Sequence, residues 1–112
     1  MSMDDHNNIV KLRGHVTGLP VERELPSGDL IVSFRLTVPR SKDKRTVSKQ
    51  LVDTFDCTAW TARTRKAALR LTERQQVVVE GALRRRFQRQ QGSPMSYVSV
   101  EVDTCKPVDS LH

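Results

Sequence analysis

Apolar and polar residues alternate through most of this sequence, and the alternation is regular enough to predict strands. It is clearest over residues 30–38, where apolar side chains occupy every second position and only Ile31 breaks the pattern. Residues 52–60 alternate as well, with a polar side that ends in Trp60, the only tryptophan of the chain. Because successive side chains of a strand point to opposite faces of a sheet, each stretch predicts one buried and one exposed face. An indole that ends an exposed face leaves a large apolar surface available to a ligand.

Two further stretches have the same period. Residues 9–20 alternate around Gly14, which indicates a bulge or a bend, and Leu19-Pro20 is expected to close this strand. Residues 76–83 include the run Val77–Val79, which is apolar on both sides. Such a strand is either covered on both faces or placed at a subunit contact.

One helix and a hairpin arm complete the pattern. Thr61 can cap a short helix over residues 62–71, whose narrow apolar stripe suits it to plug one end of a barrel. Residues 84–102 predict a long hairpin arm with its tip at 92–94. Five strands with a helix between the third and the fourth is the order of an OB-fold, a small, partly open Greek-key barrel. The predicted fold class is therefore mainly β.

The expected domain organisation is simple, because 112 residues fit one domain. We expect residues 1–8 to be a flexible N-terminus, residues 9–104 to form the OB-fold domain, and residues 105–112 to form a short C-terminal tail. No apolar run is long enough to span a bilayer and no signal-peptide core is present. We therefore expect a cytoplasmic location, associated with the nucleoid, and no membrane partner. Cys57 and Cys105 are then expected to be thiols, with a disulfide as the alternative.

The charge of the chain points to its partners. Lys and Arg number 19 against 13 Asp and Glu, which gives a formal net charge of +6, and the sequence pI is about 9.9. Such an excess makes nucleic acid the first expected partner, with an acidic protein or an anionic membrane surface second. Residues 39–50 form a basic stretch with almost no apolar residues, which predicts a mobile loop. Lys42 and Lys49 in this loop either contact phosphates or only keep the loop solvated.

Catalytic patterns are absent from the sequence. It contains no phosphate-binding glycine loop, no dinucleotide fingerprint, no zinc-protease helix motif and no C-x-x-C. The three histidines are scattered, and none accompanies a plausible nucleophile. Asp53 and Asp56 are three residues apart on a predicted strand, so they face opposite sides and cannot share a proton. We expect no enzyme activity, no cofactor and no metal.

A binding surface is predicted instead on the outer face of the barrel and along the arm. Bases stacked on Trp60 and Phe87 would contribute about 1–3 kcal/mol each, and arginines would neutralise phosphates. Stacking needs an unpaired base, so the expected ligand is single-stranded. The candidate residues are Arg13, Arg35, Thr58, Trp60, Arg84, Arg86, Phe87 and Tyr97, with Lys42 and Lys49 in the basic loop.

Several of these residues have a structural alternative. Trp60 could instead pack under the following helix, and Phe87 could fold back onto its own hairpin. Tyr97 suits a structural role as well as a binding role. Because residues 84–86 are three consecutive arginines, at least one of them must point away from any single groove.

Six short motifs, found in order along the chain, resemble the bacterial single-stranded DNA-binding protein family. They are Asn8-x-Val10-x-Leu12-x-Gly14, Leu25-Pro26-Ser27-Gly28, Phe34-Arg35-Leu36, Asp56-Cys57-x-Ala59-Trp60, Val77-x-Val79-Glu80-Gly81-x-Leu83-Arg84 and Glu101-Val102. The resemblance implies an OB-fold, binding of single-stranded DNA with little sequence preference, and a homotetramer. It also implies roles in replication, recombination and repair. In this family, Trp60 and the neighbourhood of Phe87 correspond to stacking positions, and Arg35, Arg84 and Arg86 to backbone contacts.

The chain departs from the family pattern at several points. Thr54 stands where family members often carry an aromatic, residues 73–75 lack a usual glycine, and the arm is about one residue shorter. The acidic tip that recruits repair proteins is absent from residues 108–112, so such recruitment is not expected. The tail either lies outside this sequence or is lacking, as in a tail-less paralogue. Alternative functions are a primosomal accessory of the same type, an RNA-binding OB protein, or a basic protein-interaction module.

Overall fold

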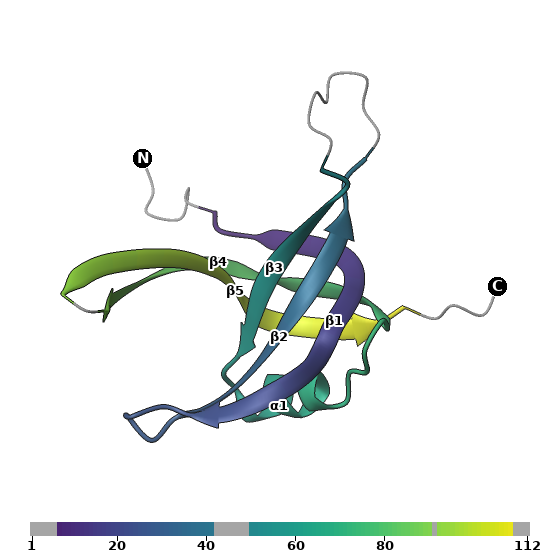
Figure 1. Ribbon diagram of the computed structural model, residues 1–112. Helices are drawn as coiled ribbons and strands as arrows, with labels where there is room; N and C mark the ends of the chain where they lie inside the picture. The colour runs from purple at the N-terminus through teal and green to yellow at the C-terminus, as the bar shows by residue number, and fades with distance from the viewer. Residues whose placement is uncertain (1–6, 42–49, 91, 109–112) are drawn as a thin grey trace, which may run out of the picture.

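The computed structural model describes residues 7–41, 50–90 and 92–108. Five strands close into a barrel in the order β1-β2-β3-β5-β4, and Figure 1 shows one short helix, α1, at the end of that barrel. This arrangement confirms the predicted OB-fold, mainly β, with the helix between the third and fourth strands. The elements are β1 (Val10–Glu24), β2 (Leu30–Pro39), β3 (Val52–Ala59), α1 (Ala62–Leu69), β4 (Gln76–Gln90) and β5 (Ser93–Pro107).

The alternation seen in the sequence places one side of each strand in the barrel interior. Small aliphatic side chains dominate there, since a five-stranded barrel has little room inside. Cys57 and Ala59 are fully buried, which confirms the face predicted for β3. The largest fully buried side chains are Leu36, Val16, Val32, Val77, Val79, Val100 and Cys57.

Helix α1 begins as predicted and ends two residues early. Thr61 is its N-cap, and the side chains of Thr61 and Thr64 each accept a hydrogen bond from the other's backbone N–H, which is a capping box. The helix ends at Leu69, and Arg70 is its C-cap. Thr64 and Ala68 face inward, and α1 contacts β1, β2, β3 and β5, so it covers one end of the core.

Strand β1 does not close at Leu19-Pro20, as the sequence predicted, but continues to Glu24. Its register against β2 shifts between Thr17 and Val21, where Gly18 has φ +79°. Proline is tolerated within a strand at such an irregularity because no ladder hydrogen bond is required from its nitrogen. Near Gly14, where the sequence predicts a bulge or a bend, β1 changes the strand with which it pairs. It pairs with β4 up to His15 and with β2 from His15 onward.

Strand β5 also runs further than predicted, to Pro107 instead of ending at Val102. Val79 pairs with Cys105 and Gly81 pairs with Val102, so β5 has one more residue than β4 between these pairs. This bulge brings Cys105 back to the interior side, where it is buried. Residues 105–107 therefore belong to the barrel and not to a tail.

Beyond the barrel, β4 and β5 continue as a paired hairpin. Residues 84–90 pair with residues 93–99, and Figure 1 shows this arm extending away from the body. The predicted arm is therefore present. Within the ranges described above, no helix is long and apolar enough to cross a membrane.

Candidate nucleic-acid interface

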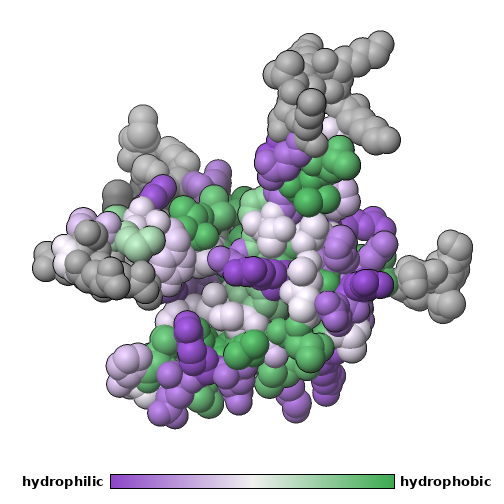
Figure 2. All heavy atoms as spheres, viewed as in Figure 1, coloured by the Kyte–Doolittle hydropathy of each residue, from purple (hydrophilic) through white to green (hydrophobic). Residues whose placement is uncertain are grey.

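A groove of about 810 Å³ lies between the β1–β2 hairpin and the β4–β5 arm. Figure 2 shows the surface hollowed between these two projections, with hydrophobic and hydrophilic side chains both at its edges. The end of β3 forms its floor. Of the residues predicted from the sequence, the groove is lined by Arg35, Thr58, Trp60, Arg86, Phe87 and Tyr97.

Trp60 follows the last residue of β3, and its half-buried ring lines the groove. It is therefore available from outside the barrel and is not sealed under α1. The guanidinium carbon of Arg86 lies 4.7 Å from the centroid of the indole, a cation–π contact. Among the described residues the buried indole Nε1 has no hydrogen-bond partner, which is unusual for a tryptophan.

Two rings of the arm are more exposed than Trp60. Phe87 is 74% exposed and Tyr97 is 40% exposed, so Phe87 has not folded back onto its own hairpin. Tyr97 is the cross-strand partner of Arg86 and shares its face of the arm, whereas Phe87 is the partner of Ser96 on the opposite face. Phe34 of β2 also lines the groove but is only 4% exposed, so the accessible rings of the groove are those of Trp60, Phe87 and Tyr97.

The arginines predicted for the groove separate into two groups. Arg35 and Arg86 line it, and Arg85 joins them although the sequence did not single it out. Arg84 is the one of the three consecutive arginines that does not line it. Arg84 shares a strand face with Arg86 but contacts Glu101 at 3.3 Å.

Arg13 does not belong to this groove, contrary to the prediction. It lines a smaller pocket of about 250 Å³ with His15 and Gln76. The reason is the change of neighbour along β1: Arg13 lies in the part that pairs with β4, opposite Val78. Only the later part of β1 borders the groove.

Of the basic loop over residues 39–50, the structure describes only the two ends, residues 39–41 and residue 50. Lys42 and Lys49 lie outside the described residues. At the base of the loop Arg40 donates two hydrogen bonds to Asp53, at 2.9 and 2.8 Å, and these bonds lower the pKa of the Asp53 carboxyl. The backbone N–H of Arg40 also bonds the carbonyl of Leu51, which ties the two ends together.

One wall of the groove was missed by the sequence reasoning. Leu19, Val21 and Arg23 of β1 line it, and the first two are 70% and 60% exposed. The sequence holds a signal for this wall, because Val21 lies two residues after Leu19 and continues the alternation past Pro20. The sequence pattern, however, predicts that the strand ends at the proline.

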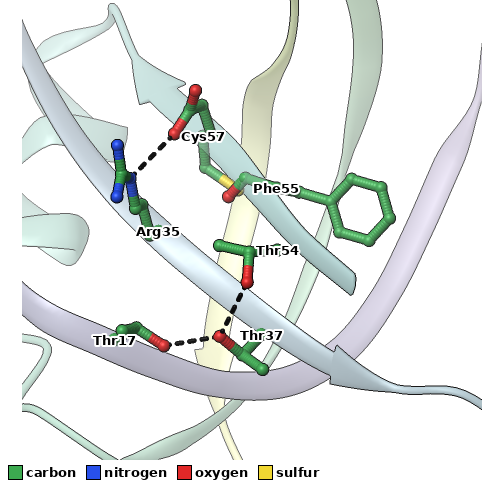
Figure 3. A network of polar contacts seen from close by, with 7 residues as sticks. Thr17, Arg35, Thr37, Thr54, Phe55 and Cys57 are labelled. Carbon is green, nitrogen blue, oxygen red and sulfur yellow. Dashed lines mark hydrogen bonds and ion pairs between the residues drawn. The ribbon is translucent and has the colours of Figure 1, made fainter. Parts of the chain in front are cut away.

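A row of hydroxyl groups from β1, β2 and β3 crosses the sheet at Thr54. Thr37 Oγ1 lies 2.6 Å from Thr17 Oγ1 and 3.3 Å from Thr54 Oγ1. Figure 3 shows these three side chains joined across neighbouring strands. These three side chains offer hydroxyl groups, and the ring of Phe55 beside them belongs to the opposite face of β3.

The part of the chain that the structure describes contains no candidate metal site. No group of three or more His, Cys, Asp or Glu side chains there could hold an ion. Cys57 and Cys105 are free thiols in the core, and burial raises the pKa of both, that of Cys57 to about 12. Both shifts disfavour the thiolate, which is the nucleophilic form of cysteine.

A closed five-stranded barrel whose outer groove combines rings with arginines defines an OB-fold binding domain. The family model of the single-strand binding protein family matches residues 7–108, and the chain belongs to that family. The crystal structure of a small single-stranded DNA-binding protein from Streptomyces coelicolor has the same fold. It matches with a TM-score of 0.66 and 24% sequence identity, over 92% of this chain and 96% of that chain. No curated protein matches the chain.

Proposed function

We propose that this protein binds single-stranded DNA with little sequence preference, by stacking bases on exposed rings and by neutralising phosphates with arginines. The observation that carries the proposal is the groove, which brings Trp60, Phe87 and Tyr97 together with Arg35 and Arg86. Stacking tolerates any sequence, because every base has a π-face. Membership of the single-strand binding protein family supports the same ligand.

The proposal includes the roles expected from the resemblance, in replication, recombination and repair at the nucleoid. It also includes self-association into a homotetramer. Exposed apolar side chains outside the groove support that assembly, namely Ile9, Leu83 and Val98. Two side-chain hydrogen bonds of 2.8 Å join Asn8 to the backbone of Leu83, so Ile9 is held beside Leu83.

Titration with oligo-dT tests the binding. We expect saturable binding that quenches the fluorescence of Trp60, the only tryptophan. Trp60→Ala should weaken binding by about 1–3 kcal/mol, the contribution of one base–ring stack. Trp60→Phe keeps a ring and should retain most of the affinity, which separates stacking from loss of the fold. An unchanged affinity of Trp60→Ala would exclude this ring as a stacking platform.

The same titration distinguishes the alternatives. Equal competition by oligo-U would extend the ligand to RNA, since phosphate neutralisation and stacking are common to both. Negligible affinity for oligo-dT at low salt would reject the proposal and favour a protein-interaction module. The logarithm of the association constant should fall with the logarithm of salt by about 0.7 for each phosphate neutralised.

A further inference from the structure

Glu101 of β5 contacts two arginines of the arm, of which Arg86 lines the groove and Arg84 does not. Its Oε2 lies 3.3 Å from Nε of Arg84 and 3.7 Å from a terminal guanidinium nitrogen of Arg86. The guanidinium of Arg86 in turn lies over the indole of Trp60. Glu101, Arg86 and Trp60 therefore form a continuous chain of contacts, from a carboxylate through a guanidinium to a ring.

This chain occupies the groups that a bound strand would need. A base that stacks on the Arg86 side of Trp60 needs the area that the guanidinium covers. A phosphate that contacts Arg86 competes with the Glu101 carboxylate for the charge of the same guanidinium, because carboxylate and phosphate oxygens both pair with this fork. Ligand and Glu101 thus compete for one arginine.

The contribution of these ion pairs to the fold is small. The side chains of Glu101 and Arg86 are 31% and 35% exposed, and ion pairs open to solvent contribute little to stability. A similar pair lies in the groove itself, where Arg35 contacts Asp56 at 3.2 Å. Because these ion pairs contribute little to stability, their main expected effect is on the affinity of the groove for a ligand.

We infer that Glu101 is a built-in competitor of DNA phosphate. In the free protein it holds Arg86 on the face of Trp60, and a bound strand replaces both contacts, with phosphate on Arg86 and a base on the ring. This inference rests on the proposed function. Its consequence is that Glu101 weakens binding and makes it easier to reverse.

Glu101→Gln tests the inference, because it removes the charge and keeps the shape of the side chain. Glu80→Gln is the matched control: Glu80 is also on a strand and paired, at 3.6 Å, but its partner Lys11 does not line the groove, whereas Arg86 does. Both variants raise the net charge equally. At about 50 mM salt, Glu101→Gln should bind oligo-dT roughly three- to tenfold more tightly than Glu80→Gln. Its salt slope should be steeper by about 0.7, so that the difference shrinks towards about 200 mM.

A second measurement shows whether the effect passes through Arg86. In an Arg86→Gln background, Glu101→Gln should give a smaller gain, because only Arg84 is then released. Equal thermal midpoints of Glu101→Gln and wild type would show that the fold is kept. If wild type binds oligo-dT but Glu101→Gln binds no more tightly than Glu80→Gln, the inference is overturned. Failure of wild type to bind would instead reject the proposed function.

Discussion

Trp60 belongs to the barrel through its backbone and to the groove through its ring. Its carbonyl accepts a hydrogen bond from the Arg65 guanidinium of α1, which fixes the chain where β3 ends. Its ring faces the groove, under the guanidinium of Arg86. Because the backbone of Trp60 is held in place, little of its conformational freedom is left to lose when a base stacks on the ring, and this suits it to binding.

The two core thiols give a prediction at the same scale. Burial raises the pKa of Cys57 to about 12, and Asp56 adds to the effect as a nearby negative charge. Since the thiolate is the reactive form, iodoacetamide at neutral pH should alkylate neither Cys57 nor Cys105 in the folded protein. The unfolded protein, as the control, should be labelled at both positions, as measured by mass spectrometry. Rapid labelling of the folded protein would show that the barrel opens far more readily than its packing implies.

The elements could be predicted from the sequence where a local pattern decides them. The alternation of β3 and the cap of α1 are set by neighbouring residues, and the structure has them as expected. In β2 the alternation holds only in part, because Ile31 and Thr37 are buried as well and Leu30 is exposed. Which strands become neighbours is decided by distant residues, so the separation of Arg13 from the groove could not be predicted. The bulge that buries Cys105 depends on the register between β4 and β5, and that register is equally invisible in the local sequence.

Close packing of β4 against β5 gives a prediction at the scale of elements. A Cβ atom built at Gly81 would lie 2.0 Å from the carbonyl oxygen of Glu101, so one of the two backbones must move. Gly81→Ala should therefore lower the free energy of unfolding by about 1–3 kcal/mol, as overpacking does. Met95→Ala, at an exposed position of the same hairpin, should change it by less than about 0.5 kcal/mol. Denaturant unfolding measures both, and equal values would contradict the close approach.

The proposed assembly is a property of the whole molecule. A single chain has a mass of 12.7 kDa, and light scattering should give about four times that mass at micromolar concentration. Association should bury exposed apolar side chains, and Leu83 and Val98 are candidates for such a contact. A Leu83→Asp variant should shift the mass downward, whereas Leu69→Asp, on the exposed face of α1, should not. A wild-type mass of one chain would reject the tetramer.

The row of threonine hydroxyls sets the two halves of the binding surface apart. Thr54 precedes Trp60 by six residues, which is about 20 Å along an extended chain, and the exposed rings lie towards the Trp60 end. A DNA strand bound across the whole surface would be held strongly at the end with the rings and only weakly at the end with the threonines. The strand would then dissociate from the threonine end first. Another protein could bind the released nucleotides while the remaining bases are still stacked on the rings.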